Sequence, residues 1–212
     1  MTNDLSNKGL FITLEGVEGA GKSTLMDYVT DLFSKAGHDV LQTREPGGTK
    51  TGEQIRNILL DSNNIGLTND TELLLMFAAR SQHLQEVINP ALSLGKIVVC
   101  DRFTDASYAY QGGGRGIEQA RIQMLEDWVQ QGLKPDLTLL FDLDVELGLR
   151  RAGKRGEADR FEKEEISFFE RIRSCYLNRA EDEPNRFRVI DSAQSFDNVK
   201  QQIQDVLKEF LC

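Results

Sequence analysis

The stretch from Gly16 to Ser23, GVEGAGKS, is the feature that most constrains how this chain can fold. It matches the pattern G-x-x-x-x-G-K-S of phosphate-binding loops. An apolar stretch at 10–14 predicts a buried strand before the loop, and apolar residues at helical spacing predict a helix at 23–35 after it. In this context backbone N–H groups and a helix N-terminus surround a polyphosphate. Lys22 would bring a positive charge to the β- and γ-phosphates, and the Ser23 hydroxyl could bind Mg²⁺.

Composition and charge narrow the class of protein. The chain has 212 residues, 40% of them hydrophobic, and a formal net charge of −9. These values fit one soluble domain over residues 1–212, and the acidic charge argues against binding to nucleic-acid polymers. Residues 1–8 lack the apolar core of a signal peptide, and no apolar run is long enough to span a membrane. We therefore expect a cytoplasmic protein.

Cysteines and histidines indicate no metal or disulfide chemistry. Cys100, Cys175 and Cys212 are too few and too scattered for a disulfide framework or a zinc site, and the sequence assigns them no role. The two histidines, His38 and His83, also lack the spacing of metal ligands.

Hydrophobic periodicity predicts strands that alternate with helices along the whole chain. We expect strands at 10–14, 40–43, 97–100, 137–141 and 187–191. We expect helices at 23–35, 52–61, 71–94, 117–131, 145–151, 164–180 and 196–211, with Pro90 kinking or interrupting the third. The three glycines at 112–114 predict a flexible loop. This pattern is typical of an α/β fold of the P-loop NTPase type: a doubly wound, five-stranded parallel sheet with helices on both faces.

Polar residues gather where the predicted strands end, which is where ligands bind in such sheets. Asp101 ends a buried strand and is the expected acid on the Mg²⁺ side of the site. The basic candidates for an acceptor phosphate are Arg44, Arg56, Arg80, Arg102 and Arg115, and the flat surfaces are Phe77 and Tyr110. Simpler interpretations stay open: Phe77 in the core, Arg115 in a solvated loop, and Arg102 in a structural ion pair with Asp101.

The segment at 150–160 carries five basic residues and two glycines. One interpretation is a solvated, charged helix end. The other is a lid, at approximately 148–160, that closes over a donor nucleotide, excludes water and brings guanidinium groups to the transferred phosphoryl group.

Four stretches together resemble the thymidylate kinase family over nearly the whole chain. They are Leu14–Thr24, Thr43–Thr49, Asp101–Phe103 with Ser107, and Ala109–Gly112. The phosphate-binding loop occurs in many families, but the Arg-Glu-Pro-Gly-Gly-Thr and Asp-Arg-Phe…Ala-Tyr-Gln stretches are specific to this one. The resemblance implies transfer of a phosphoryl group from ATP to dTMP, with Mg²⁺, in a homodimer.

The resemblance also implies a role for each matching residue. ATP would bind to Gly16, Val17, Glu18, Gly19, Ala20, Gly21, Lys22, Ser23 and Thr24, with Arg160 and the lid bases covering it. Glu18 would meet the 3′-hydroxyl of the acceptor sugar, and Tyr110 would close off the 2′ position. Phe77 would stack on thymine, Arg80 would bond its edge, and Gln111 would flank it. Arg56 and Arg102 would hold the acceptor phosphate, Pro46 and Ser107 would contact the substrate, and Ser23 and Asp101 would organise Mg²⁺.

The source of the catalytic positive charge differs within the family. Gly19 and Ala20 stand where some members carry an arginine in the loop, so this chain resembles the bacterial class that uses the lid. Gly153 occupies the middle of that lid, where related enzymes often have arginine. Arg151, Lys154 and Arg155 remain alternatives beside the catalytic residues Lys22, Asp101 and Arg102.

Two other functions are compatible with a phosphate-binding loop. A kinase for another nucleotide is disfavoured by the Glu-Pro-Gly-Gly-Thr loop and Arg80. A GTP-dependent switch would need an Asn-Lys-x-Asp motif, which this sequence lacks.

Overall fold

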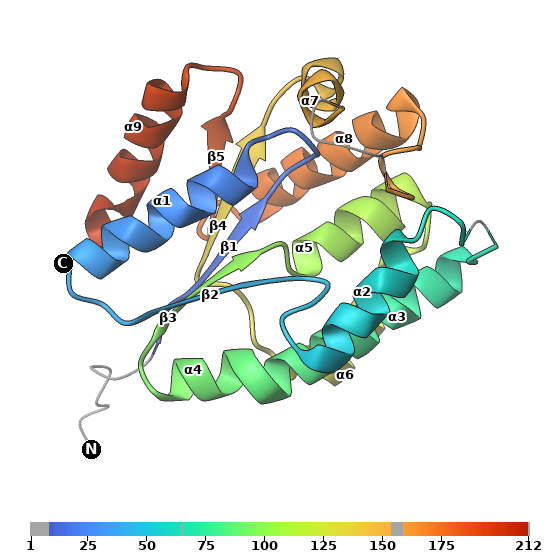
Figure 1. Ribbon diagram of the computed structural model, residues 1–212, viewed down its shortest axis with the longest axis horizontal. Coiled ribbons are helices and arrows are strands. Elements are labelled where there is room, and N and C mark those ends of the chain that lie inside the picture. Colours follow the sequence, from blue (N-terminus) through green and yellow to red (C-terminus); the bar gives the residue numbers. More distant parts are fainter. Residues whose placement is uncertain (1–8, 65, 154–158, 212) are drawn as a thin grey trace.

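The computed structural model describes residues 9–64, 66–153 and 159–211 of the chain. Its centre is a five-stranded parallel sheet in the order β2-β3-β1-β4-β5 (Figure 1). The strands are β1 Phe11–Glu15, β2 Val40–Arg44, β3 Ile97–Asp101, β4 Leu137–Asp142 and β5 Phe187–Asp191. The predicted fold class and the five predicted strands are confirmed.

The sheet order creates a switch point between β1 and β3. The chain passes from β1 outward to β2, returns to β3, and crosses to the other side for β4 and β5. In the register, Leu14 of β1 lies beside Asp101 of β3. The phosphate-binding loop and the turn after β3 therefore leave neighbouring strands at the edge where ligands bind in this architecture.

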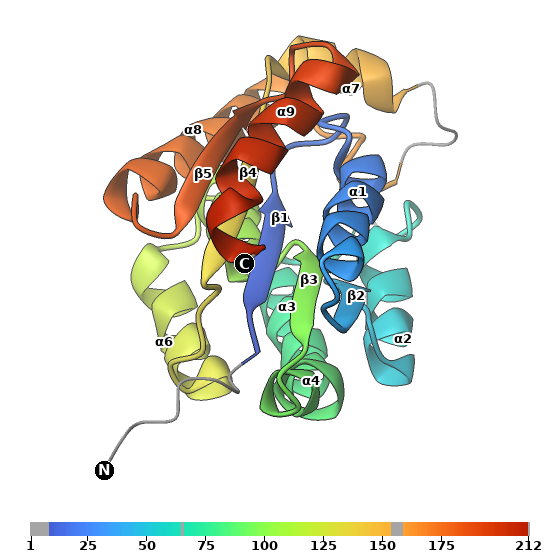
Figure 2. The same ribbon diagram turned by 90° about the vertical axis from the view of Figure 1, so that its left-hand side faces the viewer.

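Helices cover both faces of the sheet. Figure 1 shows α1 (Lys22–Lys35) and α9 (Phe196–Leu207) on one side, and α4 (Asn89–Ser93), α5 (Thr104–Ser107) and α8 (Ile166–Asp182) on the other. Figure 2 shows the same layers from the side. Because both faces are covered, β1 is buried at every position, including its two polar residues, Thr13 and Glu15. The remaining helices are α2 Lys50–Leu60, α3 Asn69–His83, α6 Gln119–Gln130, α7 Val145–Ala152 and the 3₁₀ turn η4 Lys208–Phe210.

The long helix predicted at 71–94 is present in three parts. Between α3 and α4 lies the π-helical turn η2 (Leu84–Ile88), and Pro90 occupies the first turn of α4. Proline lacks the N–H that an α-helix needs and clashes with the preceding turn. A wider π turn just before Pro90 accommodates the ring without ending the helix.

The prediction of a flexible loop at 112–114 is wrong. The chain continues from α5 into a π-helical turn, η3 (Tyr108–Gly114), which packs against α8. A Cβ on Gly113 would lie 2.8 Å from the Cβ of Cys175, and one on Gly114 would lie 2.5 Å from the Phe168 ring. These glycines permit close packing of two helices, a use of glycine that looks the same in sequence as a flexible loop.

We expect Gly113→Ala to lower the free energy of unfolding by about 1–3 kcal/mol, because an added methyl group would overfill the contact with Cys175. Urea denaturation followed by circular dichroism measures this. Gly66→Ala is the matched control, since a Cβ there meets nothing within 4 Å, and we expect it to change stability by less than about 0.5 kcal/mol. Equal stability of the two variants would contradict the packing interpretation.

Candidate active site

The phosphate-binding loop joins β1 to α1, as the sequence predicts. Gly19 and Gly21 have φ angles of 75° and 85°, in the left-handed region that favours glycine. A Cβ on Gly19 would lie 1.9 Å from the carbonyl oxygen of Gly148, so the loop backbone packs directly on α7. The sequence therefore needs glycine here both for the turn and for this contact.

Lys22 lies within the loop and is almost fully buried. Its Nζ donates to the carbonyl oxygens of Gly16 and Val17 at 2.8 and 3.1 Å. Burial, followed by the positive charge of Arg102, lowers the pKa of Lys22 to about 8. The ammonium group therefore carries its charge at neutral pH but loses it in mildly alkaline solution.

A cavity of about 210 Å³ opens beside the loop at the carboxyl edge of the sheet. Its wall includes the loop residues Glu18, Gly19, Ala20, Gly21, Lys22 and Ser23. It also includes the predicted residues Arg44, Pro46, Arg56, Arg80, Asp101, Arg102, Ser107, Tyr110 and Gln111. Gly16, Val17 and Thr24 are not among the lining residues. The structure thus brings most of the predicted site residues from distant parts of the chain to one cavity.

Glu18 connects the loop to the opposite wall of the cavity. Its Oε1 accepts a hydrogen bond from Arg102 Nη2 at 3.0 Å and from the Tyr110 hydroxyl at 2.6 Å. The Arg102 guanidinium also lies 4.6 Å from the centre of the Tyr110 ring. Within the described part of the chain, Oε2 of Glu18 is buried and has no hydrogen-bond partner, so it can accept one from a bound molecule.

Arg80 is held by a buried acid that the sequence analysis did not select. Glu45 Oε2 accepts from Arg80 Nε at 2.7 Å, and both side chains are at most 5% exposed. Arg80 Nη2 donates to Phe103 O and to Ser107 Oγ, whereas Nη1 is buried with no partner among the described residues. His83 contacts the other oxygen of Glu45 at 3.0 Å. The only sequence signal for Glu45 was its place in the Arg-Glu-Pro-Gly-Gly-Thr stretch.

Asp101 and Ser23 both line the cavity. Asp101 Oδ1 is buried and has no hydrogen-bond partner in the part of the chain that the structure describes. An unpaired carboxylate oxygen and a hydroxyl are the kinds of ligand that Mg²⁺ accepts, with phosphate and water oxygens completing its octahedron. Among the described residues there is no cluster of three or more His, Cys, Asp or Glu that could hold a metal alone.

The expectation that Phe77 stacks on a base is wrong. Phe77 is 2% exposed and packs in a core cluster with Leu73, Tyr108, Ile117 and Ile122. Its neighbour Met76 lines the cavity instead. The alternative that Phe77 belongs to the core was the correct one. Met76 shares a helix face with Glu72 and Arg80, each four residues away, so the cavity-facing stripe of α3 is one residue out of phase with the expectation.

The expectation that Arg160 covers ATP is also not supported. Arg160 is absent from the cavity wall, and its guanidinium donates to Glu72 Oε2 at 2.6 Å and to Leu59 O at 2.8 Å. Arg115 likewise pairs with Glu72 and with Glu164 and stacks on Phe168, so it is not a solvated loop residue.

Part of the predicted lid has a described structure. Arg151 lies in the last turn of α7, donates to Ser192 O at 3.0 Å, and does not line the cavity. Lys154 and Arg155 lie outside the described residues. On the far side of that gap, Asp159, Phe161 and Glu162 line the cavity.

Comparison with known proteins agrees with this arrangement. The family model for thymidylate kinase matches residues 14–203. The chain belongs to the thymidylate kinase family. A thymidylate kinase from Pseudomonas syringae pv. tomato is 59% identical over 203 residues, which cover 96% of this chain and 97% of that protein. One from Pseudomonas savastanoi pv. phaseolicola is 56% identical over the same shares.

A solved structure of the thymidylate kinase family has the same fold. The crystal structure of thymidylate kinase from Ehrlichia chaffeensis has a TM-score of 0.75 and 34% sequence identity with this chain. The match covers 95% of this chain and 99% of that one.

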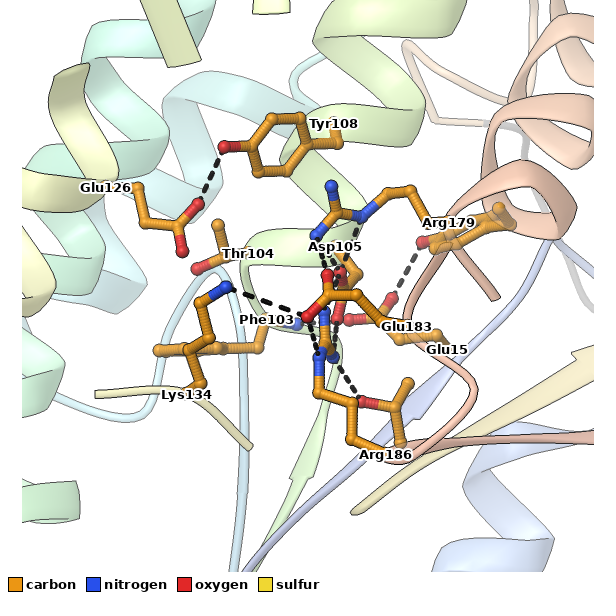
Figure 3. A network of polar contacts seen from close by, with 12 residues as sticks. Glu15, Phe103, Thr104, Asp105, Tyr108, Glu126, Lys134, Arg179, Glu183 and Arg186 are labelled. Carbon is orange, nitrogen blue, oxygen red and sulfur yellow. Dashed lines mark hydrogen bonds and ion pairs between the residues drawn. The ribbon is translucent and has the colours of Figure 1, made fainter. Parts of the chain in front are cut away.

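In this member of the thymidylate kinase family, the turn after β3 rests on a buried charged network (Figure 3). Asp105 accepts from Arg179 Nε at 2.7 Å and from both terminal nitrogens of Arg186 at 2.7 and 2.9 Å. In the same network Glu15 accepts from the Phe103 backbone N–H at 2.7 Å. The turn that carries Arg102 is thus fixed from α8, from the start of β5 and from the end of β1.

We expect a non-hydrolysable ATP analogue, with Mg²⁺, to bind about tenfold more weakly at pH 9 than at pH 7, because Lys22 with a pKa of about 8 must take up a proton to pair with phosphate above that pH. Isothermal titration calorimetry at both values measures this. In Lys22→Ala we expect weaker binding that no longer depends on pH in this range. Equal affinity of the unaltered protein at pH 7 and pH 9 would contradict the prediction that Lys22 pairs with a phosphate group.

Proposed function

We propose that this protein transfers the terminal phosphoryl group of ATP to dTMP, giving ADP and dTDP. The observation that carries the proposal is the contact of Glu18 with Arg102 and Tyr110, which joins the phosphate-binding loop to the opposite wall of one cavity. A loop that meets both substrates can hold them close enough for direct transfer. Membership of the thymidylate kinase family, and relatives of that name at 56–59% identity, support the choice of acceptor.

On the donor side, we assign the ATP phosphates to the loop at 16–24. The backbone N–H groups would surround the phosphates, and Lys22 would exchange its two carbonyl partners for phosphate oxygens. We assign Mg²⁺ to Ser23 and Asp101. When bound there, it would neutralise charge on the phosphates during transfer.

On the acceptor side, we assign the phosphate of dTMP to Arg56 and Arg102 and the sugar 3′-hydroxyl to the free Oε2 of Glu18. Tyr110 would then close off the 2′ position. The base would lie against Pro46, Met76, Ser107 and Gln111, with Arg80 Nη1 free to donate to its edge. In this assignment Met76 takes the place given to Phe77 by the family resemblance, and its thioether provides an adaptable apolar contact.

The transferred phosphoryl group needs a positive charge in addition to Lys22. We assign it to Arg102 and to the lid at approximately 148–160, where Arg151, Lys154 and Arg155 are the candidates. Arg151 would have to release Ser192 O to reach the cavity.

We further propose a single domain over 1–212, a cytoplasmic location and no binding to nucleic-acid polymers, in keeping with the net charge of −9. Among the described residues, no helix is long and apolar enough to cross a membrane.

The decisive experiment is ADP release measured with each nucleoside monophosphate as acceptor. We expect dTMP to give the highest kcat/KM, and Lys22→Ala to lower kcat by about 10²–10³-fold, because Lys22 stabilises charge that develops on the phosphates. Faster turnover of dCMP or AMP would identify a different nucleotide kinase. Nucleotide binding without transfer to any monophosphate would favour a GTP-dependent switch.

We also propose a homodimer formed through α3 and α6. Leu74, Met124 and Trp128 are 56%, 70% and 76% exposed, and their helical spacing places them on the outward faces of these two helices. The ion pair of Asp70 with Arg121 joins α3 and α6 on the same side. Large apolar side chains grouped in this way are typical of protein–protein contacts.

We expect Trp128→Glu to convert the protein from a dimer to a monomer of 23.9 kDa, because a buried carboxylate in the contact would lack a partner. Size-exclusion chromatography with light scattering measures the mass. Phe196→Glu on α9 is the matched control, since Phe196 is another exposed aromatic residue, 46% exposed, away from this face. A Trp128→Glu dimer, or a monomeric unaltered protein, would refute the proposed contact.

A further inference from the structure

Glu72 of α3 is a buried carboxylate directly behind the cavity wall, with no part in the proposed reaction. Its side chain is 0% exposed. It accepts hydrogen bonds from Gln111 Nε2 at 2.9 Å, from Arg160 Nη2 at 2.6 Å, and from Arg115 Nε at 3.3 Å to each oxygen. Of these partners, Gln111 lines the cavity.

The two arginines determine the chemical character of Glu72. Their guanidinium groups donate to both oxygens of Glu72, and a guanidinium group has no acceptor atom. Both oxygens of Glu72 therefore act as hydrogen-bond acceptors in this cluster. The Gln111 side chain must therefore present its NH₂ group to Glu72. No hydrogen bond of the described residues uses the Gln111 amide oxygen, which is left for a molecule in the cavity.

Arg80 supplies the complementary group. Two of its nitrogens are occupied by Glu45, Phe103 O and Ser107, while Nη1 is buried and without a partner among the described residues. Both residues line the cavity, so the unused amide oxygen of Gln111 is the acceptor, and the unused Nη1 of Arg80 the donor, that they have left for a bound base. A base edge with an N–H beside a C=O satisfies both. Thymine and uracil have this edge, whereas cytosine has an acceptor nitrogen beside an NH₂ group.

We propose that Glu72 is a positioning residue that holds the Gln111 amide with its oxygen toward the bound base, and so makes the site select thymine or uracil over cytosine. Glu72 touches no substrate and acts through Gln111. This inference rests on the proposed function, since it concerns the base of the acceptor nucleotide. In Glu72→Gln, two neutral amides face each other and can pair in either orientation, so the Gln111 amide is no longer fixed.

The test compares kcat/KM for dTMP, dUMP and dCMP in the unaltered protein and in Glu72→Gln. We expect the dTMP:dCMP ratio to fall about tenfold to a hundredfold in the variant, the range for loss of one base-reading contact. The dTMP:dUMP ratio should stay within about twofold, because these two bases share the edge that is read. A general structural defect would slow all three reactions without changing either ratio. Glu86→Gln, the same substitution at an exposed site on the continuation of α3, is the matched control and should change neither ratio.

An unchanged dTMP:dCMP ratio in Glu72→Gln would overturn the inference, as would an equal fall in both ratios. If the unaltered protein itself fails to prefer dTMP to dCMP, the proposed function fails first, and the two failures are thereby distinguished. If Glu72→Gln does not fold, nuclear magnetic resonance of the unaltered protein provides the test. The NH₂ signals of Gln111, assigned by their loss in Gln111→Met, should exchange with water at least about tenfold more slowly than those of exposed glutamines. Equally fast exchange would overturn the inference.

Discussion

The carboxyl group of Glu15 joins the three segments on which the site depends. It ends β1, directly before the phosphate-binding loop, and it accepts hydrogen bonds from the backbone N–H of Phe103 and from the hydroxyl of Tyr176, each at 2.7 Å. Loop, β3 turn and α8 thus meet at one buried group. Burial, followed by the negative charge of Asp105, raises the pKa of Glu15 to about 8. The hydrogen bonds from Tyr176 and Phe103 lower this pKa only in part, so the junction holds its acid buried at an electrostatic cost.

The cavity depends on the order of the strands more than on any single motif. Glu18, Arg102 and Tyr110 are separated by up to 92 residues, and they meet because β1 and β3 are neighbours at the switch point. α3 adds a second layer to the wall through one stripe of residues, Glu72, Met76 and Arg80. The buried Glu72 of this stripe contacts the cavity-lining Gln111, and the buried Glu45, which itself lines the cavity, pairs with Arg80. Such buried acids orient the groups that face the cavity and limit the rotamers available to them.

The fold and the position of the phosphate-binding loop between β1 and α1 could be predicted from sequence, because strand and helix periods and the G-x-x-x-x-G-K-S pattern are local signals. The errors concern tertiary contacts. Phe77 and Met76 are adjacent, and a helix turns by about 100° per residue. An error of one residue in the predicted phase of the helix therefore decides which of the two side chains faces the cavity. The family resemblance placed Arg160 over ATP, but its guanidinium pairs with Glu72, which lies 88 residues away in the chain. The glycines at 112–114 look like a flexible loop until the close approach of α8 is known.

The hydrogen bonds of Lys22 to the carbonyl oxygens of Gly16 and Val17 have a consequence for ligand discrimination. Any anion that binds this ammonium group must first replace two internal hydrogen bonds, so binding carries a free-energy cost. A single phosphate or sulfate ion offers few contacts to offset that cost. A triphosphate chain contacts the ammonium group and several backbone N–H groups at once, and these contacts together offset the cost. The two internal hydrogen bonds of Lys22 therefore make the loop favour a triphosphate chain over a single phosphate or sulfate ion.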